Sequence, residues 1–105
     1  MRVLLVCFGG WSSSILGKRV AKGLGDHGIR AEVQCLPVET GLTELGEFDV
    51  ALVAPQVRHM TPTVKEVAAK LGKPVLEITM QEYAAAEPES LVRRIMDATR
   101  DNCGR

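Results

Sequence analysis

The chain has 105 residues, and its thirteen Lys and Arg balance thirteen Asp and Glu, so the formal net charge is zero. This balance disfavours a general nucleic-acid binder, because polyanion binding usually needs an excess of basic residues. No apolar run approaches the length that crosses a bilayer, and three cysteines, an odd number, do not make a disulfide framework. These features favour one cytoplasmic domain over residues 1–105 with reduced thiols.

The first half of the chain predicts strand, helix and strand in turn. Residues 3–6 form a continuous apolar run that ends at Cys7, as in a strand buried on both faces. Two glycines break the run, and apolar residues then recur at helical spacing up to residue 24, with Ser12 or Ser13 as the N-cap. Residues 29–35 alternate apolar and polar side chains, which predicts a half-exposed strand with Cys35 facing inward.

The second half repeats this order. Residues 48–54 are a second nearly continuous apolar run. Thr61 is predicted as the N-cap of a helix that has Pro62 at its first position. Residues 73–78 form a short strand that starts near a proline, which suits a sheet edge. A last helix begins near Pro88, and residues 102–105 are expected to fray, which makes Cys103 incidental.

Strands that alternate with helices favour an α/β fold, here a single domain with a parallel sheet and helices on both faces. The two continuous apolar runs should be the central strands, and the other two should be edges. This gives the strand order 2-1-3-4 of a small flavodoxin-like sheet. In such sheets ligands bind beyond the carboxyl ends of the strands, where the chain direction reverses. Residues 7–14 and 55–60 are therefore predicted to meet at this edge.

The segment after the first strand has the composition of a phosphate pocket with a nucleophile at its base. A helix N-terminus favours the thiolate of Cys7, and its unbonded N–H groups bind anions. Glycines let the backbone approach a phosphoryl group, and hydroxyls add donors. The alternative is a small buried cysteine at a strand end, but this sequence context favours a reactive thiol. The candidate loop residues are Phe8, Gly9, Gly10, Trp11, Ser12, Ser13 and Ser14.

Several related sites are excluded. The glycines match neither the dinucleotide fingerprint nor the P-loop, and no C-x-x-C is present. His27 and His59 lack further ligands at metal-binding spacing, so no metal and no cofactor is expected. The loop is phosphatase-like but differs from the C-x5-R-[ST] loop of low-molecular-weight tyrosine phosphatases, because Ser13 stands at the position of their arginine. Such a loop suits a relay that holds a phosphoryl group without rapid hydrolysis.

Two segments, C-F-G-G-W-S-S-S-I-L from Cys7 and A-P-Q-V-R-H-M from Ala54, together resemble the enzyme IIB component of the lactose/cellobiose family of the bacterial sugar phosphotransferase system. One departure is Trp11, where the family usually has methionine. The resemblance implies that a histidine of a IIA protein phosphorylates Cys7 and that the phosphoryl group passes to a sugar bound by the IIC transporter. It also implies that residues 8–14 form the phosphate loop.

The second segment would flank that loop and contribute to docking through Pro55, Gln56, Arg58 and His59. Arg58 is either a direct phosphate ligand or a solvated loop arginine. A monomer is expected, without membrane insertion, that meets the membrane transiently through IIC. Two other functions stay open: a thiol-based phosphatase or arsenate reductase-like enzyme, and a non-catalytic docking module on the same fold.

Overall fold

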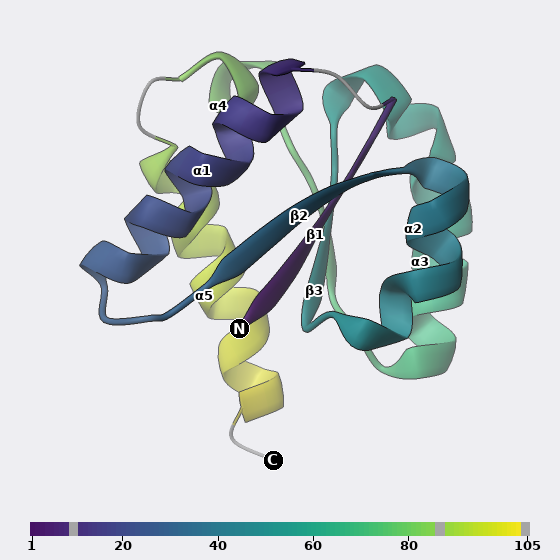
Figure 1. The fold of residues 1–105 in the computed structure, drawn as a ribbon. Helices are drawn as coiled ribbons and strands as arrows, with labels where there is room; N and C mark the ends of the chain where they lie inside the picture. Colours follow the sequence, from purple (N-terminus) through teal and green to yellow (C-terminus); the bar gives the residue numbers. More distant parts are fainter. Residues whose placement is uncertain (9–10, 86–87, 104–105) are drawn as a thin grey trace.

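The computed structural model describes residues 1–8, 11–85 and 88–103, with side chains described for residues 1–8, 15–85 and 88–99. These residues form a parallel sheet in the order β2-β1-β3-β4 with helices on both faces (Figure 1), which confirms the predicted fold class. The strands are β1 (Arg2–Cys7), β2 (Glu32–Pro37), β3 (Val50–Val53) and β4 (Val75–Glu77). The helices are α1 (Trp11–Asp26), α2 (Val38–Glu44), α3 (Thr61–Leu71), α4 (Met80–Ala84) and α5 (Glu89–Cys103), with two 3-10 segments, η1 (Leu45–Glu47) and η2 (Pro55–Met60).

The two central strands are the two continuous apolar runs of the sequence. They pair in parallel from Val3 beside Val50 to Val6 beside Val53. β2 pairs with the other side of β1, and β4 pairs with the other side of β3. Because helices cover both faces, all four side chains of β3 are buried. Burial on both faces therefore sets which strands are central, as the sequence predicts.

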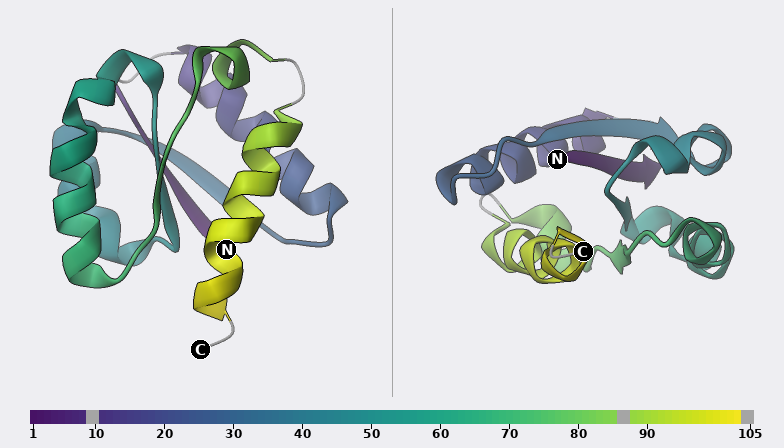
Figure 2. Two further views of the ribbon diagram at one scale, coloured as in Figure 1. Left: turned by 180° about the vertical axis from the view of Figure 1, so that it is seen from behind. Right: turned by 90° about the horizontal axis from the view of Figure 1, so that it is seen from below.

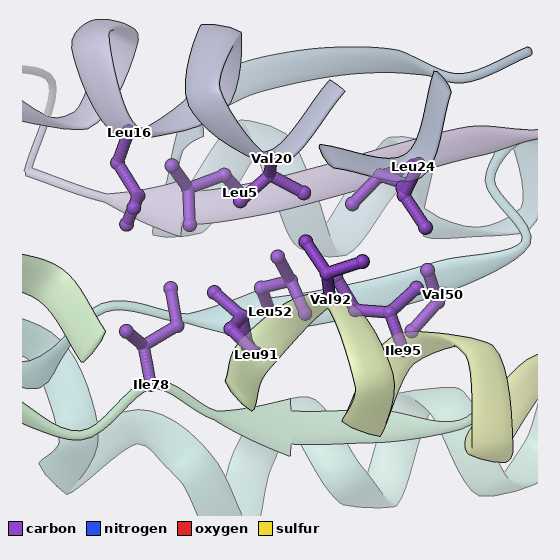
Figure 3. Close-up of a cluster of buried hydrophobic side chains, with 11 residues drawn as sticks. Leu5, Leu16, Val20, Leu24, Val50, Leu52, Ile78, Leu91, Val92 and Ile95 are labelled. Carbon is purple, nitrogen blue, oxygen red and sulfur yellow. The ribbon is translucent and has the colours of Figure 1, made fainter. Parts of the chain in front are cut away.

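One face of the sheet is covered by α1 and α5 (Figures 1 and 2). Figure 3 shows the apolar side chains of these helices converging on those of β1 and β3. The two helices approach closely at Gly23, where a Cβ atom would lie 2.7 Å from Cγ2 of Val92. The buried cluster comprises Val3, Leu5, Leu16, Val20, Leu24, Val50, Leu52, Ile78, Leu91, Val92 and Ile95.

The opposite face is covered by α2 and α3. Its buried cluster comprises Leu4, Val6, Cys7, Leu45, Phe48, Ala51, Val53, Ala54, Val57, Val64 and Ala68. Half-buried side chains of α2 and α3 pack against this cluster. Both faces are thus occupied by helices, which leaves the carboxyl edge of the sheet for a site. Within the part of the chain that the structure describes, no helix is long and apolar enough to cross a bilayer.

Four short helical elements were not predicted: α2, η1, α4 and η2, whose residues 55–60 were expected only as a segment at the sheet edge. α2 has seven residues and η1 three, too few for a helical period to be read from the sequence. They arise because a parallel connection from β2 to β3 must cross the sheet, and α2 packs against β1 and β2 on the way. α4 has five residues, and its capping box of Thr79 and Glu82 was a readable signal, since a Thr followed three residues later by Glu marks helix starts.

The predicted start of one strand and of two helices is wrong. β2 begins at Glu32 rather than at residue 29, because the N–H of Ile29 still bonds the carbonyl of Leu24 and closes the end of α1. α1 begins at Trp11, so the two serines predicted as N-caps, Ser12 and Ser13, lie within its first turn.

α3 begins at Thr61 itself, with Met60 as its N-cap. The prediction of Thr61 as the cap is wrong because η2 runs directly into α3 and gives Thr61 helical φ and ψ of −52° and −45°. Two predicted strands are shorter than residues 48–54 and 73–78: β3 spans Val50–Val53 and β4 spans Val75–Glu77, although single backbone hydrogen bonds continue beyond their ends. The last helix is longer than predicted, because α5 continues through residue 102 to Cys103.

Candidate functional site

Cys7 is the last residue of β1 and lies at the carboxyl edge of the sheet. Its partner in β2 is Pro37, and its Sγ lies 3.9 Å from the carbonyl oxygen of Leu36. Only 2% of Cys7 is exposed, and it belongs to the buried cluster beneath α2 and α3. The strand order puts the reversal of chain direction between β1 and β3, so Cys7 stands at the predicted switch point.

η2 follows β3 and returns the chain to the same edge, so the two predicted segments meet. The N–H of Ala54 donates to the carbonyl of Val6, at 3.0 Å. Val57 is fully buried in the same apolar cluster as Cys7 and holds η2 against the end of β1. Figure 1 shows the tip of β1 beside this segment. The second motif is therefore anchored next to the cysteine by one hydrogen bond and one buried side chain.

The predicted flanking residues differ in exposure. Pro55 is half-buried, whereas Gln56, Arg58 and His59 are exposed. The side chains of Arg58 and His59 make no hydrogen bond or ion pair with any described part of the chain. A cation held at the carboxyl edge without an internal anion remains available to a phosphoryl group or to an acidic partner.

The predicted phosphate loop is only partly described. Phe8 follows Cys7 and is 72% exposed, so it does not belong to the core. Gly9 and Gly10 lie outside the described residues. Trp11, Ser12, Ser13 and Ser14 form the first turn of α1, and their side chains lie outside the described residues as well. The backbone of this turn leads into the helix whose N-terminal N–H groups have no intrahelical acceptors.

The chemistry of this edge follows from the elements that come to it. The start of α1 supplies unbonded N–H groups and the positive end of the helix dipole, which both stabilise an anion. Arg58 adds a positive charge from η2. Cys35, the other cysteine whose side chain is described, is half-buried in β2 and packs against both apolar clusters. The arrangement suits a thiol that binds and carries an anionic group rather than a pair of cysteines.

The sequence interpretation missed one side-chain pair at this edge, Thr61 and Glu77. Thr61 is buried, and its Oγ1 donates a hydrogen bond of 2.8 Å to Oε2 of Glu77 at the end of β4. Sixteen residues separate the two side chains, so no local pattern pairs them.

No group of three or more histidine, cysteine or carboxylate side chains that could hold a metal ion occurs in the described ranges.

A buried carboxylate lies in α4, which follows β4 at the same edge. Burial alone would raise the pKa of Glu82. The bonds from the Thr79 backbone N–H, the Ser90 hydroxyl and the Arg94 guanidinium outweigh burial and hold that pKa below its usual range. The guanidinium Nη1 of Arg94 lies 2.7 Å from Oε1 of Glu82, and Thr79 and Glu82 form a reciprocal capping box. This network joins α4 to α5.

Fold and site together define a class of protein: a small doubly wound parallel domain with a thiol at its switch point. The family model described as the lactose/cellobiose-specific IIB subunit of the phosphotransferase system (PTS) matches residues 2–94. The chain therefore belongs to this IIB family, whose members are components of a sugar phosphotransferase system. No curated protein matches the chain in sequence.

Solved structures support the same assignment. The lactose-specific IIB domain from Streptococcus pneumoniae superposes with a TM-score of 0.81 at 22% identity, covering 93% of this chain and 96% of that one. Its identity is low, so it supports the fold alone. The cellobiose-specific IIB protein from Borrelia burgdorferi has a TM-score of 0.72 and 31% identity, covering 96% of this chain and 93% of its own. The similarity thus spans nearly the whole of each domain.

Proposed function

We propose that the protein is a phosphocysteine carrier: Cys7 accepts a phosphoryl group from a phosphohistidine of a IIA protein and delivers it to a sugar bound by a IIC transporter. One observation carries this proposal. The cysteine of a IIB family member is the last residue of β1, at the switch point, directly before the segment that leads into the N-terminus of α1. A nucleophile and an anion-binding helix start are then adjacent.

The chemistry balances without a cofactor. In the first step the sulfur of Cys7 forms a bond to phosphorus, the phosphorus–nitrogen bond of phosphohistidine breaks, and the thiol proton goes to the departing imidazole. In the second step a sugar hydroxyl attacks phosphorus, the sulfur–phosphorus bond breaks, and the hydroxyl proton is released as the thiolate re-forms. Arg58 and the backbone of residues 8–14 would bear the charge of the transferring group.

Partner proteins would dock on the exposed side chains at the carboxyl edge. Phe8, which follows Cys7, and the η2 side chains of Gln56, Arg58 and His59 are exposed and would contact IIA and IIC in turn. Aromatic residues and arginine are enriched in the cores of protein interfaces. The chain would act as a monomer in the cytoplasm and reach the membrane only through IIC, because a carrier must dissociate from its donor before it meets its acceptor.

Phosphorylation by a donor tests the proposal directly. The chain is incubated at neutral pH with phosphoenolpyruvate, the general phosphotransferase proteins and candidate IIA proteins, and then analysed by intact and peptide mass spectrometry. One added phosphoryl group on Cys7 is expected. The Cys7→Ser variant should lose it, and the matched Cys35→Ser variant should keep it, since Cys35 lies in β2 away from the carboxyl end.

Two results would contradict the proposal. If phosphorylated IIA proteins leave the chain unmodified while they phosphorylate another IIB protein, the carrier function is wrong and a docking module becomes the better interpretation. If the chain hydrolyses an aryl phosphate and Cys7→Ala abolishes that activity, a thiol phosphatase is favoured.

A further inference from the structure

The segment that carries Arg58 and His59 is fixed at both of its ends to the last residues of β4. We infer that the hydrogen bond between Thr61 and Glu77 is a positioning device that holds η2 against Cys7, and that the rate of phosphoryl transfer depends on it. The inference about the rate rests on the proposed function, whereas the inference about the position of η2 does not. Thr61 and Glu77 are positioning residues, because neither is argued to touch the phosphoryl group.

The N-terminal end of η2 is tied down through the backbone. Val53, the last residue of β3, pairs with Glu77 in the sheet, and its carbonyl accepts the N–H of Ile78 at 2.9 Å. One residue later the N–H of Ala54 donates to the carbonyl of Val6. η2 therefore starts from a point that is bonded to β4 on one side and to β1 on the other.

The C-terminal end of η2 is tied down by side chains. Thr61 is the first residue of α3, and only 5% of it is exposed. Its hydroxyl donates to the carboxylate of Glu77, and a hydrogen bond to an ionised acceptor is stronger than a neutral one. If Glu77 were removed, a buried hydroxyl would lose its partner and α3 would be free to shift relative to β4.

η2 needs such anchors because its own backbone is not a continuous helix. Val57, in its middle, has φ and ψ of −120° and 22°, outside the helical region. A kinked 3-10 segment has no regular hydrogen-bond ladder that would set its path. The buried side chain of Val57 shares an apolar cluster with Cys7 and fixes how closely η2 packs against the sheet. The bond between Thr61 and Glu77 then sets where the following turn, with Arg58 and His59, lies.

The test replaces the hydroxyl without changing the shape of the side chain. Thr61→Val removes the donor, Thr61→Ser keeps it, and Thr63→Val makes the same change at an exposed position of α3. Hydrogen exchange of residues 55–61 and the rate of Cys7 phosphorylation by IIA are measured for each. We expect Thr61→Val to speed exchange in this segment and to slow transfer by roughly tenfold, since small displacements of binding groups are costly. Thr61→Ser and Thr63→Val should behave like the wild type.

A second variant controls for the possibility that Thr61→Val acts through a folding defect. Glu77 is exposed, so Glu77→Ala removes the acceptor without leaving a cavity in the core. It should reproduce both effects of Thr61→Val, and the double variant should be no worse than Thr61→Val alone, because both changes break one bond. Fully additive effects, or wild-type exchange and transfer in both single variants, would overturn the inference.

The two proposals fail in different ways. If IIA phosphorylates wild-type Cys7 but the variants transfer at the wild-type rate, the carrier function stands and the positioning role is wrong. If no donor phosphorylates the wild type, the proposed function is wrong, and exchange at residues 55–61 alone decides whether the Thr61–Glu77 bond fixes η2. Faster exchange confined to this segment in Thr61→Val would support the anchor, and unchanged exchange would refute it.

Discussion

Two connections at the carboxyl edge of the sheet differ in how their charged side chains are buried and paired. After β4, Glu82 is 6% exposed and bonds to the Thr79 backbone, the Ser90 hydroxyl and Arg94. After β3, Arg58 is exposed and its side chain bonds to nothing in the described part of the chain. The buried carboxylate after β4 is neutralised by Arg94 of α5, whereas Arg58 has no counterpart within the described residues.

The difference separates a structural role from a role in recognition. A buried carboxylate is tolerated only when every lone pair has a partner, so the Glu82 network fixes the relative positions of α4 and α5. An exposed cation contributes little to stability and remains free to meet an external anion. We therefore expect changes in the two connections to affect different measurements, namely the free energy of unfolding and the rate of transfer.

The largest expected effect on stability comes from Glu82→Ala. The variant loses the carboxylate that accepts from the Thr79 N–H, the Ser90 hydroxyl and the Arg94 guanidinium, so the free energy of unfolding should fall by about 3 kcal/mol. Chemical denaturation with urea measures it. Glu66→Ala, at an exposed position of α3, is the control and should change stability by less than about 0.5 kcal/mol. A loss no larger than that of the control would show that the network adds nothing.

A somewhat smaller effect is expected where α1 and α5 touch. Gly23→Ala places a methyl group 2.7 Å from Cγ2 of Val92, and the free energy of unfolding should fall by about 1 to 2 kcal/mol. Gly25→Ala, two residues further along α1, meets nothing within 4 Å and should raise stability by about 0.5 kcal/mol through helix propensity. If both variants were stabilised, the contact between α1 and α5 would be looser than the structure indicates.

Acid should weaken the connection after β4 selectively. The folded-state pKa of Glu82 lies below its value in the unfolded chain, so its contribution to stability is complete above the unfolded pKa, about 4.3, and disappears as the pH falls through the folded pKa. The difference in unfolding free energy between wild type and Glu82→Gln should therefore shrink below about pH 4. Urea denaturation at a series of pH values checks this, and a difference that grows in acid would contradict it.

The smallest effect on stability, and the sharpest contrast, is expected for Arg58→Ala. The free energy of unfolding should change by less than about 0.5 kcal/mol, while phosphorylation by IIA slows by roughly fivefold at low ionic strength and by less at high ionic strength. Lys65→Ala, an exposed cation of α3 beyond η2, is the control for net charge. Equal slowing in both variants would mean that overall charge, rather than the position of Arg58, attracts the donor.

The sequence predicted the arrangement of the sheet and the meeting of its two motifs. Residues 3–6 and 48–54 are apolar at every or nearly every position, and strands of that kind lie inside a parallel sheet covered on both faces. Because connections between parallel strands are right-handed and short, only a few strand orders are compatible with this sequence of elements, and the order 2-1-3-4 is one of them. The juxtaposition of Cys7 with η2 followed from that order.

Other features could not be predicted because they depend on residues far apart in the chain. α2 is too short and too rich in threonine and glycine to show a helical period, and it forms because the crossover packs on β1 and β2. Thr61, followed by Pro62, has the sequence pattern of a helix N-cap. η2 nevertheless continues into α3 without a break, and the Thr61 hydroxyl donates to Glu77 instead of capping the helix. The capping box of α4 could be read from the sequence, but the guanidinium that pairs with its carboxylate lies twelve residues beyond Glu82.

The sequence by itself determined the alternation of strands and helices, the two central strands and the place of the cysteine at the end of the first, because hydrophobic periodicity is a local property. Only the tertiary structure decided which polar groups meet: the Thr61 hydroxyl with the Glu77 carboxylate, and Glu82 with Arg94. It also left Arg58 exposed on η2, the segment packed against the end of β1. Polar pairs between distant residues depend on how the elements pack, since a buried polar group must find its partner wherever the fold supplies one.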